Sequence, residues 1–233
     1  MKKGIFHLHS NFSYDSLTSI NKIISFSISN NLDFIVLTDH DTIKGSQILS
    51  LEVNRRKLNI EVPISAEYKT EFGDVIAMFL FEEINYTKWD EFYSSVKKQG
   101  GILILPHPYD GHKNLDYLAK QVDVIEAFNS RSSVDNNFKS YMLAKKFNKP
   151  IIYSSDSHIP NTLGNVLLCH ESQFSLKESI LNNYIFPIKM KRSQYLDFFI
   201  SQINKAIYYK DIKLFFYVIY VFIRRLFNFK IHE

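Results

Sequence analysis

The sequence predicts an α/β fold in which a mostly parallel sheet is covered by helices on both faces, as in a barrel. Two observations support this prediction. Short apolar runs rich in β-branched residues alternate with helix-length segments, and such repeated units favour parallel strands with right-handed crossovers. In addition, runs such as Ile102–Leu105 are apolar at every position, which is typical of strands buried on both faces.

Seven strands and five helices follow from the spacing of apolar residues. The expected strands are Ile5–Leu8, Phe34–Leu37, Val62–Ala66, Val75–Phe79, Ile102–Leu105, Val124–Ala127 and Ile151–Ser154. The expected helices are Thr18–Asn30, Lys44–Leu58, Thr87–Gln99, Asn114–Gln121 and Val134–Asn148. The segment Glu67–Phe79 has no helix between its strands, so we expect a hairpin there.

The length of 233 residues fits one large domain with an appendage. We expect a catalytic domain over residues 1–186 and a helical, aromatic-rich and basic extension over residues 187–233. The extension has nine Lys and Arg against three Asp and Glu, or +6, which leaves −2 of the total +4 for the domain. Nucleic acid is therefore a less favoured partner, and an anionic substrate needs a local positive centre such as a metal ion.

The extension contains an unbroken apolar and aromatic run, Leu214–Ile223. This run is too short to cross a bilayer, which needs about 20 residues. One alternative is a helix that packs against the domain or a subunit partner. The other is an interfacial helix with Arg224, Arg225 and Lys230 near anionic lipid. We favour the first alternative, because an aromatic run flanked by few charges is more often buried.

The chain reads as cytoplasmic, with peripheral membrane contact through the extension as an alternative. Cys169 is the single cysteine, so neither an intrachain disulfide nor a thiol-rich metal site can form. Lys2 and Lys3 precede a strand that His7 interrupts, and this start lacks the apolar stretch of a secretory signal.

Potential metal ligands follow five of the expected strands. Taken singly, a loop histidine is usually solvated and an aspartate after a strand often caps a helix. Jointly, these residues meet where barrel enzymes place their sites, at the carboxyl ends of the strands. Strand alternation should also point His7 and His9 the same way. The candidates are His7, His9, Asp15, Asp39, His40, Glu67, His107, Asp156 and His158, whereas His112, His170 and His232 are expected on the surface.

So many ligands exceed the needs of one tetrahedral ion, which indicates a cluster of two or three divalent ions with a bridging carboxylate. Nitrogen and oxygen ligands suit zinc, manganese or iron, and the choice among these stays open.

These motifs, in this order and spacing, resemble the PHP (polymerase and histidinol phosphatase) domain over roughly residues 3 to 170. The resemblance implies a distorted (β/α)7 TIM-like barrel that hydrolyses phosphoesters with a metal cluster. It also implies three sets of ligands. His7, His9, Glu67 and Asp156 would hold one ion, Glu67 would bridge to a second that His107 also binds, and Asp15, His40 and His158 would hold the third.

One departure from the family pattern concerns the hairpin. Many relatives similar to nuclease-like members have a histidine after the hairpin glycine, but here Gly73 is followed by Asp74. We expect Asp74 to bind the second ion, with a plain hairpin-turn role as the alternative. Glu126 could orient a ligating histidine, and Arg131 could hold a substrate phosphate with its planar guanidinium.

The predicted function is hydrolysis of a small phosphorylated metabolite or nucleotide by attack of a metal-bridging hydroxide. Either a water molecule or Asp39 would protonate the leaving alkoxide. The alternatives are a nuclease, a noncatalytic metal-binding accessory module and a protein-tyrosine phosphatase. The compact chain offers no inserted domain to hold a polymer, which favours a small substrate.

Overall fold

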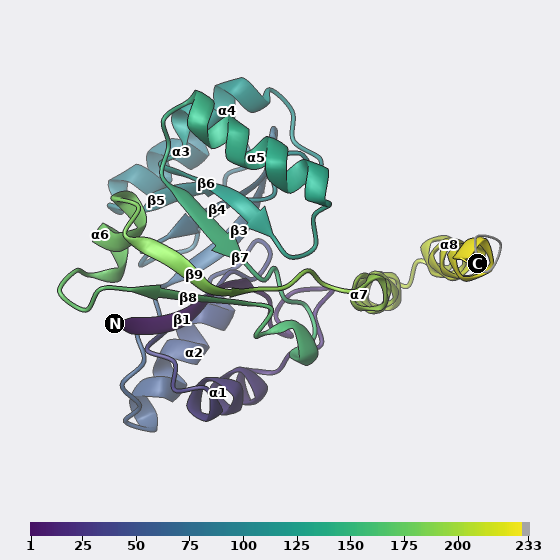
Figure 1. Ribbon diagram of the computed structural model, residues 1–233, viewed down its shortest axis with the longest axis horizontal. Helices are drawn as coiled ribbons and strands as arrows, with labels where there is room; N and C mark the ends of the chain where they lie inside the picture. Colours follow the sequence, from purple (N-terminus) through teal and green to yellow (C-terminus); the bar gives the residue numbers. More distant parts are fainter. Residues whose placement is uncertain (230–233) are drawn as a thin grey trace.

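A computed structural model describes residues 1–229 of the chain (Figure 1). Over this range the strands are β1 Lys2–Leu8, β2 Phe34–Leu37, β3 Ser65–Thr70, β4 Gly73–Met78, β5 Ile102–Leu105, β6 Val124–Asn129, β7 Ile151–Ser154, β8 Val166–His170 and β9 Ile185–Met190. The α-helices are α1 Ile20–Ser29, α2 Lys44–Arg55, α3 Trp89–Lys98, α4 Leu115–Gln121, α5 Val134–Lys146, α6 Leu176–Leu181, α7 Tyr195–Tyr208 and α8 Ile212–Phe229, and one 3-10 turn spans Pro160–Thr162.

The strands form two mixed sheets, with orders β2-β1-β8-β9 and β3-β4-β5-β6-β7. The parallel pairs are β1–β2, β5–β6 and β6–β7, as the repeated strand–helix units predict. The pairs β3–β4 and β4–β5 are antiparallel, so the predicted hairpin is confirmed. Strand β8 pairs antiparallel with both β1 and β9.

The expected barrel is not closed within residues 1–229, because the two sheets meet only through isolated bridges. Leu8 bridges Ser157 at one border, and Phe34 bridges Glu61 at the other. His7 and Asp156 lie at the first border with φ of 58° and 45°. A left-handed residue turns the chain out of a regular ladder, so pairing there is limited to single bridges.

Strands β2 and β5 are buried at every position, which confirms the prediction from their apolar composition, whereas β9 is largely exposed. In β2, Phe34 and Val36 face the core between the sheets, whereas Ile35 and Leu37 pack with α1 and α2. In β5, Ile104 faces the shared core and Leu103 faces the cluster of α3, α4 and α5. Figure 1 shows α1 and α2 on one side of the molecule and α3, α4 and α5 on the opposite side.

The sequence patterns missed β8, α6 and β9, which complete the first sheet and cover the shared core. Strand β9 crosses the expected domain boundary at residue 186. His170 at the end of β8 is fully buried beside the Phe34 ring, and His112 is partly buried with Nε2 2.7 Å from the Asp74 carbonyl. The expected surface position was therefore wrong for both histidines, and His232 lies outside the described residues.

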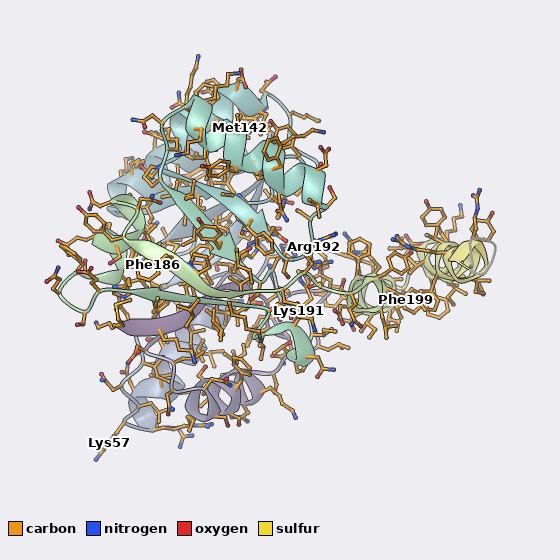
Figure 2. The ribbon with its side chains drawn as sticks, in the orientation of Figure 1. Lys57, Met142, Phe186, Lys191, Arg192 and Phe199 are labelled. Atoms are coloured by element: carbon orange, nitrogen blue, oxygen red, sulfur yellow. The ribbon has the colours of Figure 1, made fainter. Side chains whose placement is uncertain are left out.

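The extension forms two helices that project from the body of the molecule (Figure 1). Helix α7 is held to the body by Asn204, whose Nδ2 donates to the carbonyls of Tyr14 and Ser16 at 3.4 and 3.3 Å. Helix α8 packs against α7, where the rings of Phe199 and Phe222 stack with centroids 4.1 Å apart. Figure 2 shows Phe199 on α7.

The outer face of α8 stays uncovered. Phe216, Tyr217 and Tyr220 are 65%, 63% and 58% exposed, and Ile223 is 46% exposed. The favoured expectation, that the run Leu214–Ile223 is buried against the domain, is therefore not met in the single chain. Among residues 1–229, no helix combines the length and apolar character needed to cross a membrane.

Candidate metal centre

Four predicted ligands from distant parts of the chain converge where the ends of β1 and β7 meet Glu67 of β3. His7 Nε2 lies 3.5 Å from Glu67 Oε2 and 3.7 Å from Asp156 Oδ1. His9 Nε2 lies 3.4 Å and 3.5 Å from the same two oxygens. These side chains can therefore surround one ion.

The backbone at the ends of β1, β5 and β7 departs from regular strand geometry. His7, His107 and Asp156 have φ of 58°, 29° and 45°, values that are uncommon for residues with a Cβ atom. Such conformations cost on the order of 1–3 kcal/mol each and persist where the surrounding packing enforces them. His7 and His9 thus converge through an irregularity in β1 rather than through simple strand alternation.

Glu67 connects this group to further histidines. Its Oε1 lies 3.0 Å from His107 Nε2, and its Oε2 lies 3.2 Å from His40 Nδ1. Asp15 Oδ2 in turn lies 3.2 Å from His158 Nε2 and 3.5 Å from His40 Nε2. The structure therefore brings together eight of the candidates, all except Asp39 and Asp74, in overlapping groups that share His7, His9 and Glu67.

Several of the converging atoms are buried and have no hydrogen-bond partner. They are His7 Nε2, His9 Nε2 and Glu67 Oε2. A buried polar atom without a partner costs about 1–3 kcal/mol, and here these unpartnered atoms gather at one site. Divalent cations would satisfy these lone pairs, so the residues present fit a metal cluster.

Behind the centre, Glu126 fixes the orientation of His7. His7 Nδ1 donates to Glu126 Oε1 at 2.8 Å, which directs Nε2 toward Glu67 and Asp156. Glu126 Oε2 also accepts from the backbone N–H of His107 at 2.7 Å and from Asn129 Nδ2 at 2.9 Å. The expected role of Glu126 matches this geometry.

The buried charges shift the pKa values of the ligands strongly. Burial favours the neutral carboxylic acid, yet the neighbouring histidines hold the pKa of Glu67 well below its usual range. Burial lowers the pKa of His40 and His107, but Glu67 and other carboxylates outweigh it and raise both to about 9. Burial, His158 and His40 together lower the pKa of His9 to about 3.

The centre opens into a cavity of about 450 Å³. Arg131 lines it, with Nη1 beside His158 Nδ1 and 3.8 Å from Asp156 Oδ1. Asp74 also lines the cavity, but its carboxylate lies 3.4 Å from Lys69 Nζ, outside the three ligand groups found among the described residues. The structure thus brings Arg131 to the centre and leaves Asp74 at its wall.

Asp39 does not reach this cavity. It is fully buried and accepts hydrogen bonds from the backbone N–H of Ser10 and from the hydroxyls of Ser10 and Ser13, each at 2.7 Å. Gly45 packs against it so closely that a Cβ atom would lie 1.8 Å from Asp39 Oδ2. The Ser13 hydroxyl also lies 3.2 Å from His9 Nδ1. Through its bonds with Ser10 and Ser13, Asp39 therefore holds the loop that follows His9 in position.

Other cavity residues gave no signal in the sequence. Tyr14 stacks on His40 with ring centroids 4.8 Å apart. The position of Tyr14 beside Asp15 in the ligand loop is the one feature of the sequence that could have indicated its place in the cavity. Phe198, Gln202 and Lys205 reach the cavity from α7. No sequence pattern links a helix about 190 residues downstream to this loop.

Comparisons with known proteins identify relatives of this chain. The family model described as the PHP domain matches residues 6–184. An uncharacterized protein of Methanocaldococcus jannaschii is 30% identical over 175 residues, which cover 70% of this chain and 68% of the relative.

Two solved structures share the fold. A two-domain protein from Bacteroides vulgatus that contains a predicted PHP-like metal-dependent phosphoesterase has a TM-score of 0.67 and 20% identity. The match covers 81% of this chain and 65% of that protein, so this chain spans less than two thirds of its length. A putative metal-dependent phosphoesterase from Bifidobacterium adolescentis has a TM-score of 0.53 and 12% identity, over 66% of this chain and 87% of that one.

Proposed function

This chain belongs to the PHP domain family, and from that premise we propose that it is a metal-dependent phosphoesterase acting on a small phosphorylated substrate. The observation that carries the proposal is the convergence of unpartnered ligand atoms, His7 Nε2, His9 Nε2 and Glu67 Oε2, at the edge of an open cavity. Two or three divalent ions of zinc, manganese or iron suit this nitrogen and oxygen set.

We further interpret the two sheets as a distorted (β/α)7 barrel that is opened at both borders. The isolated bridges Leu8–Ser157, Phe34–Glu61 and His40–Glu67 support this interpretation, because they join the sheets into one ring of β1 to β7. The metal centre lies at the carboxyl ends of these strands, where barrel enzymes place their sites.

The residues around the cavity would have two roles in a phosphoesterase, metal binding and phosphate binding. His7, His9, Glu67 and Asp156 would hold one ion, Glu67 and His107 a second, and Asp15, His40 and His158 a third. Bound ions would lower the pKa of a coordinated water and neutralise charge on the phosphoryl oxygens. Arg131 projects its guanidinium toward Asp156 and His158, a position suited to binding a phosphate oxygen.

The size of the cavity favours a small phosphomonoester or nucleotide over a polymer. About 450 Å³ is within the range of small-molecule sites, and α7 closes one side of it. Because buried Asp39 has no access to the cavity, protonation of the leaving alkoxide by water is the better of the two alternatives.

Phosphate release from p-nitrophenyl phosphate and from bis(p-nitrophenyl) phosphate tests the proposal. The purified protein is first depleted of metal and then supplied with manganese, zinc or iron(II). We expect metal-dependent turnover of the monoester above that of the diester. Preference for the diester would support the nuclease alternative, and no turnover of any phosphoester would support a noncatalytic metal-binding module.

We also propose that the protein works in the cytoplasm with α8 resting on an anionic membrane surface. The aromatic outer face of α8 supports this, as do Lys213, Arg224 and Arg225, since α8 contains no Asp or Glu. A second copy of α8 would bring like charges together, whereas an anionic lipid surface complements them.

A further inference from the structure

We propose that α7 completes the substrate site, and that Lys205 on this helix binds a second anionic group of the substrate, away from the phosphoester. This inference rests on the proposed function and adds a substrate class to it. Helix α7 begins at Tyr195, beyond residues 6–184 that the family model matches, so the helix lies outside the matched domain.

The first support is that α7 holds Arg131 in place. The Arg131 guanidinium lies 5.0 Å from the centroid of the Phe198 ring, and its Nη2 donates to Ser201 Oγ at 3.0 Å. Ser201 is fully buried although it lies on a helix of the extension. The same guanidinium faces Asp156 and His158. Arg131 is therefore contacted by α7 on one side and by residues of the metal centre on the other.

The second support is the position of Lys205, which the Tyr14 ring separates from His40 of the metal centre. The Tyr14 ring lies nearly parallel to His40, with an interplanar angle of 13°. Lys205 Nζ lies 5.0 Å from the centroid of the same Tyr14 ring. Both Lys205 and Tyr14 line the cavity, and the ring holds the ammonium there through a cation–π contact.

The third support is the charge arrangement along the cavity wall. The carboxylates outside the ligand set have partners: Asp110 accepts from Ser132 and Asn136, and Asp74 pairs with Lys69. Arg131 is engaged as described, whereas Lys205 forms none of the ion pairs found among residues 1–225. The ammonium of Lys205 is therefore the cation available to an anionic group that enters with the substrate.

Two pairs of probes test the inference on the metal-loaded full chain. Phenylphosphonate and 4-phosphonobenzoate differ by one carboxylate and cannot be hydrolysed, so their dissociation constants are measured by calorimetry. Phenyl phosphate and 4-carboxyphenyl phosphate are the matching substrates. We expect the wild type to bind 4-phosphonobenzoate about fivefold more tightly than phenylphosphonate, a gain in the range of a partly exposed ion pair.

Lys205→Met keeps the length of the side chain and removes its charge, so it should abolish this preference while phenylphosphonate binding stays unchanged. Lys205→Arg should retain the preference. Lys213→Met, on α8 and outside the cavity lining, is the control and should bind both phosphonates as the wild type does.

The inference is overturned if the wild type shows no preference, if Lys205→Met keeps it, or if Lys205→Met weakens both phosphonates equally, since equal weakening indicates a structural role. A preserved preference without hydrolysis of either phosphate ester would contradict the proposed function and support the binding inference. Binding of neither phosphonate by the metal-loaded wild type would overturn both.

Discussion

At the scale of single residues, the candidate ligands of the metal centre differ in proton affinity although all are largely buried. His7 faces Glu67, Asp156 and Glu126, and these carboxylates raise its pKa well above the ordinary value despite its burial. Burial, together with the neighbouring His158 and His40, lowers the pKa of His9 to about 3. Without metal, His7 therefore carries a proton between the carboxylates that surround it. His9 stays neutral, so its imidazole can bind an ion without first losing a proton.

Removal of one central ligand should disable the whole centre. His7→Ala or Asp156→Ala should reduce metal content and lower phosphoesterase turnover by more than about 100-fold, because even groups that only orient ligands contribute 10- to 100-fold. Metal analysis and phosphate release measure the two effects.

His170→Ala is the matched control, because His170 is equally buried but contacts Phe34 and Ser179 rather than the centre. This variant should melt earlier yet keep full metal content per folded molecule. Near wild-type activity and metal content in His7→Ala would refute the ligand assignment.

Metal binding should release protons at neutral pH. The pKa of His40 and of His107 is about 9, so both imidazoles carry a proton at pH 7.5 that an incoming ion must displace. Calorimetry in buffers of different ionisation enthalpy should show release of more than one proton, and apparent affinity should rise between pH 7 and 9. Histidines with the ordinary pKa of 6.5 would release almost none, so a heat independent of the buffer would contradict this prediction.

Asp74→Asn distinguishes a ligand from a wall residue. If Asp74 binds the second ion with Glu67 and His107, the neutral amide should weaken that ion, and metal titration should show lower affinity at one site. Because Asp74 pairs with Lys69 and stands outside the three ligand groups, we now expect unchanged metal stoichiometry. Loss of one ion per molecule would restore Asp74 as a ligand.

At the scale of elements, the two helices of the extension have different surroundings. Helix α7 is fixed to the body by Asn204 and by the contact of Ser201 with Arg131. Helix α8 contacts α7 and exposes aromatic residues on its other side. A helix that is apolar on all sides is normally covered by other apolar groups. We therefore expect the outer face of α8 to bind a further surface.

Charge reversal on α8 should weaken binding to anionic vesicles. Lys213→Glu combined with Arg224→Glu should lower vesicle affinity by at least about 30-fold, since each basic residue contributes about 1 kcal/mol near such a surface. Sedimentation with vesicles at low and physiological salt measures the effect, and binding should weaken as salt screens the charges.

Lys44→Glu combined with Lys57→Glu is the control, because both residues belong to the α2 region and Figure 2 places Lys57 far from α8. Equal loss of binding in both double variants would indicate a nonspecific charge effect. A wild-type dimer in solution without vesicle binding would show that a second copy covers α8 instead.

At the scale of the whole molecule, the metal centre lies on the border where the two sheets meet. His7 comes from one sheet, and Glu67 from the other. Isolated bridges and a few backbone hydrogen bonds, rather than a regular ladder, join the two sheets in the described chain, so ions bound between these side chains would also join the sheets. Metal binding and stability of the fold should therefore be coupled.

The metal-free protein should lose stability as pH rises from 6.5 to above 9. In the folded state the pKa of His40 and of His107 is about 9 against 6.5 for the ordinary side chain, so protonation favours folding. This contribution is complete below pH 6.5 and is lost as the pH passes through about 9. Thermal unfolding with a chelator should show a falling melting temperature over this range.

With metal present, the melting temperature should rise above that of the metal-free protein, and the difference should grow with pH as proton competition disappears. His40→Gln should flatten the metal-free profile, because it removes one of the histidines whose pKa is raised in the folded state. A metal-free melting temperature that increases between pH 6.5 and 9 would contradict the assigned proton positions.

The sequence by itself predicted most strands and helices of the first 154 residues and singled out the candidate ligands that the structure brings together. One expected strand was misplaced, because β3 spans Ser65–Thr70 rather than Val62–Ala66. Apolar spacing is a local property, and His, Asp and Glu at strand ends keep their meaning wherever parallel strands share an edge. Tertiary structure decided the rest. Asp39 and Asp74 have the same chemistry as Asp156 in the sequence, yet Ser10 and Ser13 bury one and Lys69 pairs with the other. The contacts of Lys205 with Tyr14 and of Ser201 with Arg131 join residues far apart in the chain. No local pattern encodes such contacts, because they depend on how complete elements pack.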